Sequence, residues 1–349
     1  MKKVLFVIGG RSGEHEISLI SGKHLLKALD RKLFEPLLMI IQKDGVMTLG
    51  KESDLEVLSD NPKKVKTPQG VQVSIRPYKL NGKQPALIAG DKVYEFDLAF
   101  PILHGPGGED GTIQGLFELS EIPVVGCGVR ASAICMDKGL TKRICMQARL
   151  PVVPFEEIYR EDFVKRNEAK ELPWPFPVFV KPANLGSSLG VSKVNSETEL
   201  KSALDSAFKL DDKVLVEPAI SGRELEIAIL GKRGELIASP AGEVRCRPGE
   251  FYSYDAKYVD PDAAEILIPT KLSDQELKDI QQISKNIFNA LQCHGMARID
   301  FFMNENGAFL MNEVNTIPGF TPISMYPKLM GLAGVSYKDL ITRLIELAN

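Results

Sequence analysis

The sequence lacks the features that mark secreted, membrane-spanning and nucleic-acid-binding proteins. No apolar run approaches the length that crosses a bilayer. The five cysteines are scattered without a Cys-x-x-Cys pair, which indicates buried or free thiols in a reducing compartment. The formal net charge of −3 gives no basic surplus, which argues against non-specific binding to nucleic acid. We therefore expect neither a membrane nor a nucleic acid as a partner.

The N-terminal apolar run does not predict a signal peptide. Val4–Ile8 follows two lysines, but it has only five residues and ends at Gly9-Gly10. This run is too short for the apolar core of a signal peptide. The protein is therefore expected to be cytoplasmic.

The composition is that of an ordinary folded protein. The 349 residues are 44% apolar and 26% charged, without an internal repeat or a low-complexity segment. A chain of this length buries a large core and is expected to form two or three domains.

A first glycine-rich loop follows the N-terminal apolar run. Gly9–Gly13 joins the strand Val4–Ile8 to a helix expected over His15–Leu29, and such a corner can face an anion or another ligand. Glu14, at the start of this helix, is a candidate ligand group, although an acid there also suits the helix dipole. A dinucleotide site is a further alternative: the full G-x-G-x-x-G is missing, but Asp30 lies where that fingerprint has its acid.

A second loop, His104–Gly111, has four glycines in eight residues and follows a strand expected over Asp97–Leu103. So many glycines indicate that the backbone passes close to another group. His104 stands at the carboxyl end of its strand, where open α/β sheets bind ligands, or it is a hydrogen-bonded loop histidine. Residues 42–95 are polar and rich in turn sequences, so we expect surface hairpins there.

A third loop, Pro182–Gly190, lies between strands expected over Val178–Lys181 and Val191–Val194. Its small side chains expose backbone N–H groups, and Ser187 and Ser188 add hydroxyl donors, so the loop can fold over phosphates. It is not a P-loop, because G-x-x-x-x-G-K-[ST] is absent and the lysine precedes the loop. A flexible hairpin tip is the alternative.

Two apolar runs near the C-terminal end predict a β-hairpin. Ala297–Met303 and Ala308–Val314 flank the turn sequence Asn304–Gly307. Asp300 lies inside the first run and Glu313 inside the second. Acidic side chains within such apolar runs are explained if they bind a cation. The alternative is that they simply face solvent, as most acidic side chains in strands do.

The polar residues of this hairpin predict a metal site. Asp300, Glu313 and Asn315 offer two carboxylates and an amide oxygen, the hard ligands that suit Mg²⁺ beside phosphates. The strand period of two places Glu313 and Asn315 on one face, and Arg298 on the face of Asp300. In the turn that follows, the N–H groups around Gly319 can also face a ligand.

The rest of the chain predicts further regular elements. Helices are expected over Thr112–Ser120, Ser196–Phe208, Ser273–Leu291 and Ser336–Ala348, and Ala131–Arg149 is expected to be mostly helical. Strands are expected over Glu35–Ile41, Ile122–Val125, Val214–Glu217 and Glu224–Leu230. Ser273 and Glu276 form the sequence of a capping box.

Six motifs, taken in order over residues 4–325, resemble those of the D-alanine–D-alanine ligases of the ATP-grasp superfamily. They are Gly9-Gly10-x-Ser12-x-Glu14-x-x-Ile17-Ser18, His104-Gly-Pro-Gly-Gly-Glu-Asp-Gly111, Lys181-Pro-Ala-Asn-Leu-Gly-Ser-Ser-Leu-Gly190, Tyr254-Asp-Ala-Lys-Tyr258, Ala297-Arg-Ile-Asp300 and Asn312-Glu-Val-Asn-Thr-Ile-Pro-Gly319. One such motif has little specificity, whereas six in this order have much.

The resemblance implies an α/β protein with a three-domain ATP-grasp architecture and an open parallel sheet in its N-terminal domain. The implied domains are an N-terminal substrate-binding domain (1–137), a central ATP-grasp domain with the phosphate loop (138–223) and a C-terminal catalytic domain with the metal site (224–349). It also implies ATP, two Mg²⁺ (or Mn²⁺) ions, D-alanine as substrate and a homodimer.

For the nucleotide, the resemblance implies that Lys138 and Lys181 hold phosphates under the loop that carries Gly186, Ser188 and Gly190. Glu217 and the backbone at Ile220 would take the adenine edge, and Glu224 the ribose hydroxyls. Asp300, Glu313 and Asn315 would bind the metal ions that bridge the phosphates.

For the amino acids, the resemblance implies that the carboxylate of a first D-alanine attacks the γ-phosphorus, and that the amine of a second attacks the resulting acyl phosphate. Glu14 would pair with the first ammonium, Arg298 and the Gly319 N–H would stabilise the oxyanion, and Ser324 would hold the second carboxylate. His104, Lys257 and Met325 would lie at the substrates, Met325 near the second side chain. Ser187 and Tyr258 would tie the two closing loops to Glu14 and exclude water.

Other functions fit part of the pattern. A D-alanine–D-lactate or D-alanine–D-serine ligase would share the fold, although the Tyr254–Tyr258 loop differs from the one that the resemblance associates with lactate. A nucleotide-binding sensor without turnover is a second alternative, against which the complete metal ligands, Arg298 and Glu14 argue. A dinucleotide-dependent enzyme built on Gly9–Gly13 is the third.

Overall fold

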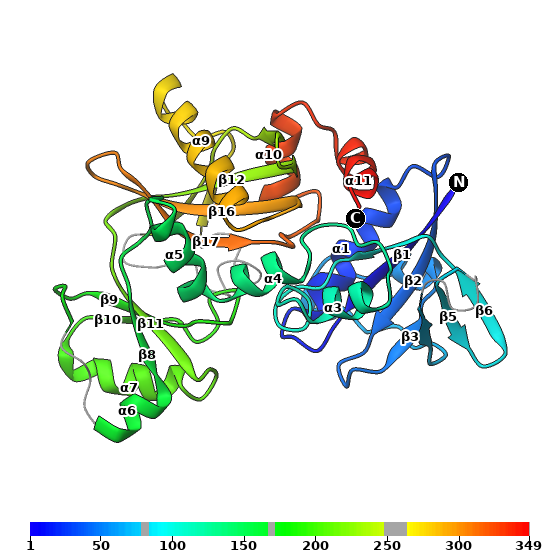
Figure 1. The fold of residues 1–349 in the computed structure, drawn as a ribbon, viewed down its shortest axis with the longest axis horizontal. Helices are drawn as coiled ribbons and strands as arrows, with labels where there is room; N and C mark the ends of the chain where they lie inside the picture. Colours follow the sequence, from blue (N-terminus) through cyan, green and yellow to red (C-terminus); the bar gives the residue numbers. More distant parts are fainter. Residues whose placement is uncertain (78–83, 167–171, 248–263, 349) are drawn as a thin grey trace.

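The computed structural model describes residues 1–77, 84–166, 172–247 and 264–348, and these residues form four β-sheets with helices packed against them (Figure 1). In Figure 1 the first sheet and a small sheet lie at the right, the middle sheet at the lower left, and the third large sheet above and between them. The chain ends with a helix that returns to the first sheet.

The first sheet is the open parallel sheet that the sequence predicts. β1 (Lys2–Gly9) lies between β2 (Phe34–Ile41) and β7 (Leu98–Pro101) and is parallel to both. β3 (Met47–Leu49) joins β2 as an antiparallel edge strand. The loop after β1 leads into α1 (His15–Ala28), so that Glu14 lies at the carboxyl edge of this sheet.

Two strands are shorter than the sequence predicts. β7 ends at Pro101, two residues before Leu103, and residues 122–125 form an isolated bridge between Val124 and Ala99 rather than a full strand. Single hydrogen bonds continue past the prolines, from the N–H of Ile102 to the carbonyl oxygen of Val7 and from the N–H of Val125 to that of Ala99.

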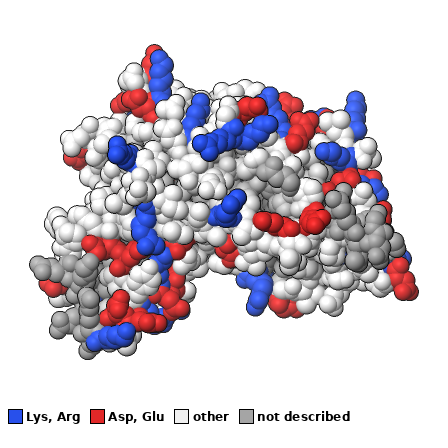
Figure 2. Space-filling model, in the orientation of Figure 1, with Lys and Arg blue, Asp and Glu red and all other residues white. Residues whose placement is uncertain are grey.

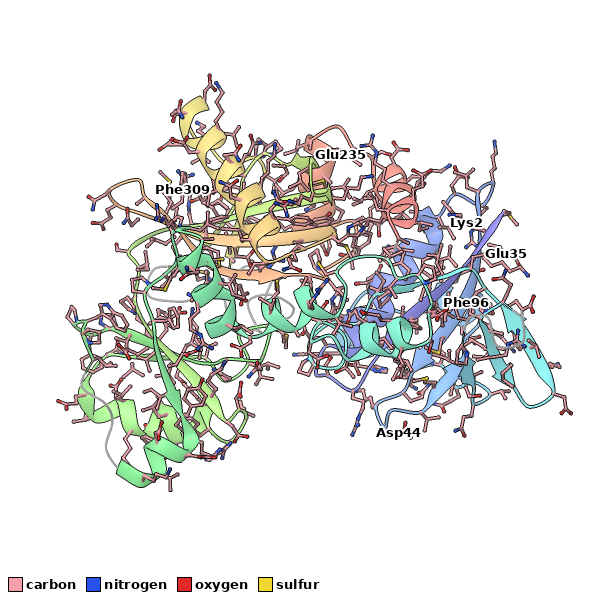
Figure 3. The ribbon with its side chains drawn as sticks, viewed as in Figure 1. Lys2, Glu35, Asp44, Phe96, Glu235 and Phe309 are labelled. Carbon is pink, nitrogen blue, oxygen red and sulfur yellow. The ribbon has the colours of Figure 1, made fainter. Side chains whose placement is uncertain are left out.

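Residues 42–95 do more than decorate the surface. In their described part, β4 (Ser74–Arg76), β5 (Ala86–Ala89) and β6 (Lys92–Glu95) form the small antiparallel sheet. Its apolar side chains share a buried cluster with the first sheet. Phe96, which directly follows β6 and is labelled in Figure 3, belongs to the same cluster and is 1% exposed. The same segment contains α2 (Glu52–Glu56) and the short 3₁₀ helix η1 (Pro62–Lys64).

The middle sheet carries the third predicted loop between two of its strands. Its strands, in spatial order, are β10 (Ser192–Val194), β9 (Val178–Pro182), β11 (Lys213–Pro218) and β8 (Glu156–Tyr159), all antiparallel. α6 (Arg160–Arg166) and α7 (Glu197–Ala207) pack against this sheet and share with it a hydrophobic cluster.

The third sheet contains the predicted hairpin. Its strands, in spatial order, are β15 (Ala264–Leu267), β14 (Gly242–Cys246), β12 (Gly222–Lys232), β16 (Gly295–Asn304) and β17 (Phe309–Asn315), with β13 (Glu235–Ala238) also paired to β12. The helices after the first sheet and around the third sheet are α3 (Thr112–Leu119), α4 (Val129–Met136), α5 (Lys138–Gln147), α9 (Asp274–Ala290), α10 (Met325–Leu332) and α11 (Tyr337–Glu346). The hairpin and the capping box that opens α9 are both confirmed.

The stretch Ala131–Arg149, expected to be mostly helical, contains two helices, α4 and α5. The break lies at Asp137, whose backbone is extended and whose carboxylate accepts a hydrogen bond from the N–H of Leu140 at 2.9 Å. An acidic N-cap therefore starts a new helix, and its first residue is Lys138.

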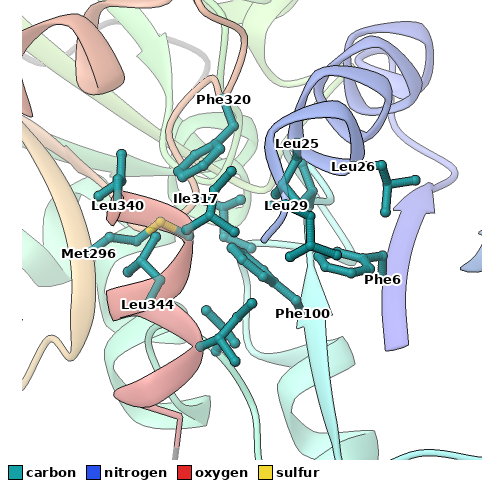
Figure 4. Close-up of a cluster of buried hydrophobic side chains, with 14 of the residues drawn as sticks. Phe6, Leu25, Leu26, Leu29, Phe100, Met296, Ile317, Phe320, Leu340 and Leu344 are labelled. Atoms are coloured by element: carbon teal, nitrogen blue, oxygen red, sulfur yellow. The ribbon is translucent and has the colours of Figure 1, made fainter. Parts of the chain in front are cut away.

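One apolar core joins the first sheet to the third. Figure 4 shows Phe6 and Phe100 from the first sheet beside Ile317 and Phe320 from the turn after β17. The C-terminal helix α11 adds Leu340 and Leu344 to the same cluster. The apolar side chains of the middle sheet form a separate cluster. Within the described part of the chain, the middle sheet therefore does not share the core that joins the first sheet to the third.

The surface agrees with the small net charge. On the face drawn in Figure 2, acidic and basic side chains are interspersed rather than sorted by sign. Over the described stretches, no helix is both long and apolar enough to cross a membrane.

Candidate active site

The hairpin β16–β17 brings four polar side chains to one face of the third sheet. Arg298 pairs with Asn315 and Asp300 pairs with Glu313, and the register shifts directly after Asp300. Arg298 donates to both oxygens of Asp300, through Nε at 2.8 Å and Nη2 at 2.7 Å. The convergence predicted from the period of two is confirmed.

Arg298 is a fixed cation in the carboxylate corner, the group formed by Arg298, Asp300, Glu313 and Asn315 on the hairpin. Its Nε lies 3.1 Å from Oε2 of Glu226, a buried carboxylate on β12. Burial alone would lower the pKa of Arg298, but the carboxylates of Asp300 and Glu226 raise it well above its usual value. Arg298 therefore stays charged at any pH at which the protein is folded.

The donor set of the corner fits Mg²⁺, with one difference from the expectation. Asp300 and Glu313 supply carboxylate oxygens, whereas Asn315 directs its Nδ2 to Asp300 at 3.0 Å rather than its amide oxygen. Lys138 places its Nζ 3.3 Å from Oε2 of Glu313. Among the described residues, no three His, Cys, Asp or Glu side chains gather as a metal set, so a metal here depends on these two acids and an amide.

A cavity of about 440 Å³ opens between the middle and third sheets. The predicted residues that line it are Lys138, Lys181, Ser188, Glu217, Ile220, Glu224 and Glu313. Apolar side chains such as Phe179, Val244 and Phe302 form other parts of its wall. A cavity of this size, lined by both apolar and charged side chains, suits a nucleotide-sized ligand. Gly186 and Gly190 belong to the loop beside it but do not line it.

A carboxylate held between two lysines lies at the back of this cavity. Lys181 places its Nζ 2.6 Å from Oε2 of Glu217 and 3.1 Å from Oδ1 of Asn312. Lys142, on α5, places its Nζ 2.7 Å from Oε1 of the same Glu217 and is fully buried. Burial alone would raise the pKa of Glu217, but the two ammonium groups lower it by more, so the pKa lies below its usual value and the carboxylate is ionised.

The sequence interpretation missed Lys142 and Asn312. A signal for Lys142 was present, because it lies four residues after Lys138 and therefore on the same face of a helix. A lysine in an amphipathic helix normally faces solvent, and nothing in the sequence places this one against Glu217.

Glu14 lies where three loops meet. It is 7% exposed and immediately precedes α1. The hydroxyl of Ser187 donates to its Oε1, as the resemblance implied, and a Cβ added at Gly105 would lie 3.0 Å from its Oε2. Ser187 and Ser188 have φ of +52° and +56°, a left-handed conformation that non-glycine residues adopt at a cost.

The next residue fixes the glycine loop that carries Glu14. The ring of His15 contacts the carbonyl oxygen of Gly10 through Nδ1 at 2.6 Å and the hydroxyl of Thr67 through Nε2 at 2.9 Å. Thr67 belongs to the segment 42–95, so part of that segment supports the site.

The contacts of His104 match the alternative of a hydrogen-bonded loop histidine. Its Nδ1 lies 3.0 Å from the carbonyl oxygen of Ile317, and its Nε2 lies 3.3 Å from the hydroxyl of Ser21. Burial lowers the pKa of His104 below its usual value, so the ring is neutral near pH 7. Its predicted contact with substrate would have to be made beside these two partners.

Glu109 is a second residue that the sequence interpretation missed, although it lies inside the second motif. Its carboxylate accepts from the N–H of Gly105 at 2.7 Å and from the N–H of Ile317 at 3.2 Å. Together with His104, it engages both the N–H and the C=O of Ile317. Burial and the nearby charge of Glu14 raise the pKa of Glu109 to about 8.

The turn after β17 places Gly319 against Ser324. A Cβ at Gly319 would lie 3.0 Å from Oγ of Ser324, so the backbone and the hydroxyl share one small space. Oγ of Ser324 also accepts from the N–H of Thr321 at 3.2 Å. Met325 is 8% exposed and packs against Gly242, so most of its side chain belongs to the core.

One predicted motif falls on residues that the structure does not describe, and the structure removes the support for the dinucleotide alternative. Lys257, Tyr258 and the rest of the Tyr254–Tyr258 motif lie outside the described residues, so their roles remain predictions. Asp30 pairs with Lys338 of α11 at 2.8 Å, which commits it to the C-terminal helix rather than to a ribose at the glycine loop.

The architecture defines the class: a loop on one antiparallel sheet faces carboxylates on a second across a cavity, as in ATP-grasp proteins. The fold is similar to VanG D-Ala:D-Ser ligase from Enterococcus faecalis, with a TM-score of 0.84 and 34% identity over 99% of both chains. It is also similar to the D-alanine-D-alanine ligase from Coxiella burnetii, with a TM-score of 0.81 and 35% identity over 100% of this chain and 95% of that one. The chain has the mixed α/β ATP-grasp fold.

Within this class, the chain belongs to the D-alanine–D-alanine ligase family. Family models described as D-ala D-ala ligase N-terminus and C-terminus match residues 3–127 and 144–346. The chain is 43% identical to D-alanine–D-alanine ligase A of Chromobacterium violaceum over 348 residues, which is 99% of this chain and 94% of the relative. It is 41% identical to D-alanine–D-alanine ligase A of Escherichia coli (strain K12) over 348 residues, 99% of this chain and 95% of the relative.

Proposed function

We propose that the protein joins two D-alanine molecules into D-alanyl-D-alanine at the expense of ATP, releasing ADP and phosphate. The observation that carries this proposal is the hydrogen bond from Ser187 of the phosphate loop to Glu14 of the amino-acid side. This hydrogen bond joins the nucleotide site to the amino-acid site, and such a ligation requires both. The product is a precursor of peptidoglycan, so the protein serves cell-wall biosynthesis.

On the nucleotide side, the cavity would hold ATP. Glu217 and the backbone at Ile220 would take the adenine edge, and Glu224 the ribose hydroxyls. Lys138 and Lys181 would face the phosphates, because each is a part-buried cation on the cavity wall. Asp300, Glu313 and Asn315 would hold two Mg²⁺ or Mn²⁺ ions, which when bound neutralise phosphate charge.

On the amino-acid side, Glu14 would pair with the ammonium of the first D-alanine. Its charge orients the substrate so that the carboxylate meets the γ-phosphorus, the P–O bond to ADP breaks, and an acyl phosphate forms. The loop around Ser187 keeps water away from this intermediate.

The second D-alanine would complete the reaction beside the turn after β17. Ser324 would hold its carboxylate, and its neutral amine would attack the acyl carbon, with phosphate as the leaving group. Arg298 and the Gly319 N–H would stabilise the oxyanion that develops, because both are fixed before the reaction. The proton of the amine would leave to the acyl phosphate oxygens or to solvent.

We further propose the division into residues 1–137, 138–223 and 224–349, a homodimer and a cytoplasmic location. One detail bears on the second boundary: β12 begins at Gly222, two residues before the third unit as proposed. We propose that the protein binds neither nucleic acid nor membranes. The interspersed charges on the face drawn in Figure 2 are in keeping with this proposal.

The direct test is an assay of purified protein with ATP, Mg²⁺ and D-alanine, in which both ADP and the amino-acid product are measured. We expect ADP formation to depend on D-alanine and to match the dipeptide mole for mole. ADP formation that is independent of D-alanine, or nucleotide binding without turnover, would contradict the proposal.

The second-site alternatives are tested by competition. VanG D-Ala:D-Ser ligase is a structural relative, so D-serine and D-lactate are the relevant competitors. With equal D-alanine and D-lactate, we expect dipeptide to dominate at pH 7 and its share to rise toward pH 9, because the neutral amine fraction rises. Predominance of D-alanyl-D-lactate or D-alanyl-D-serine at pH 7 would replace the substrate assignment and leave the ATP chemistry standing.

A further inference from the structure

Lys142 is a charged residue for which the proposed reaction has no direct use. Its side chain is fully buried, and it is not among the residues that line the cavity. Besides Glu217 at 2.7 Å, its Nζ has the carbonyl oxygen of Val153 at 3.4 Å and the ring of Phe155 at 5.9 Å. A lysine is rarely buried so completely unless its charge has a partner that needs it.

The two lysines that hold Glu217 differ in what they can reach. Lys181 lines the cavity and its side chain is 11% exposed, so a phosphate can compete for it. Lys142 is closed off from the cavity and has only Glu217 as a carboxylate partner within 4.0 Å among the described residues. The cluster of three side chains therefore has one more positive than negative charge, and the surplus is available only through Lys181.

We propose that Lys142 is a positioning residue that compensates the charge of Glu217 while Lys181 turns to a nucleotide phosphate. Without Lys142, Lys181 would be the only cation on a carboxylate that is 1% exposed. Removing Lys181 from Glu217 would then leave a buried unpaired charge, which is strongly unfavourable. This inference rests on the proposed nucleotide site and adds a residue that acts on phosphate affinity from outside the cavity.

The test compares ADP with adenosine, because only ADP carries the phosphates that Lys181 would bind. Dissociation constants are measured by calorimetry without D-alanine in wild type and in Lys142→Met, and thermal unfolding confirms that each protein is folded. We expect the preference for ADP over adenosine to fall by about tenfold in Lys142→Met, the size of one charge-assisted hydrogen bond.

A double variant separates the charge effect from a packing effect. In Lys142→Met with Glu217→Gln, no carboxylate remains to hold Lys181, so we expect the preference for ADP over adenosine to return toward the wild-type value. Both affinities can fall together there, because Glu217 is assigned to adenine, but their ratio should recover. This variant removes one lysine and the carboxylate together and leaves Lys181, which lines the cavity, as the remaining charge of the cluster. It therefore provides a second test if Lys142→Met does not fold.

The matched control is Arg143→Met, which removes the same charge from the next position of α5. Arg143 is 53% exposed and faces Glu157 at 3.7 Å, away from Glu217, so we expect its ADP-to-adenosine ratio to equal that of wild type. An unchanged ratio in folded Lys142→Met, or a double variant whose ratio stays low, would overturn the inference. If wild type itself does not bind ADP, the proposed function fails instead.

Discussion

The two halves of the proposed site are held together by different forces. The amino-acid half lies where the first and third sheets share one apolar core, and its loops are joined by hydrogen bonds such as those of His104 and Glu109 to the Ile317 peptide. The nucleotide half lies where the middle and third sheets meet, and there Lys138 pairs with Glu313 and Lys181 contacts Asn312. One half is therefore joined mainly by packing and hydrogen bonds, and the other mainly by charged side chains.

This difference indicates how each half receives its substrate. Among the described residues, the proposed amino-acid half is already joined by packing and hydrogen bonds, so we expect it to set geometry. In the proposed nucleotide half, cations and anions that neutralise one another would have to exchange partners on binding phosphates and metal ions, so we expect this half to set affinity for the nucleotide.

The largest effect is expected in the carboxylate corner that both halves share. Asp300→Asn or Glu313→Gln removes one charge from the proposed metal site and should lower kcat by at least about a hundredfold, because less charge stabilises the transferring phosphoryl group. The measurement is turnover over a range of Mg²⁺ concentrations, with circular dichroism to confirm folding. Near-normal turnover in either folded variant would remove the metal assignment.

A smaller and more selective effect is expected at Glu14. Glu14→Gln should raise the KM for the first D-alanine by about ten- to a hundredfold while the KM for ATP changes little, because one charge-assisted contact is lost on one side only. Steady-state kinetics with each substrate varied in turn gives both constants. If the variant only unfolds at a lower temperature, Glu14 serves the helix dipole rather than the substrate.

A pH effect is expected in the packed half, from Glu109. Its pKa of about 8 in the folded protein lies above the ordinary glutamate value of 4.5, so the folded state binds more protons between these values. The stabilising contribution is complete below pH 4.5 and is lost as the pH rises through 8. Between pH 6 and pH 9, Tm of wild type should therefore fall by a few degrees more than Tm of Glu109→Gln. Parallel curves for the two proteins would contradict this assignment.

Features that depend on neighbouring residues could be predicted from the sequence, whereas features that depend on contacts between distant residues could not. The hairpin and the loop at Ser187 follow from local patterns: apolar runs, turn residues and small side chains. The break at Asp137 was missed because a cap inside a long helical pattern resembles a polar surface position. Lys142 and Glu109 were missed because their partners, Glu217 and Ile317, are distant in sequence and only the tertiary fold brings them together.

The central claim is that the carboxylate of one D-alanine, held beside Glu14, attacks ATP before the second D-alanine reacts. D-alanine labelled with oxygen-18 in its carboxylate tests this claim directly, with mass spectrometry of the phosphate released. If an acyl phosphate forms, the attacking oxygen leaves with the phosphoryl group, so each phosphate should carry one labelled oxygen for each dipeptide made. Unlabelled phosphate, formed together with dipeptide, would contradict the account.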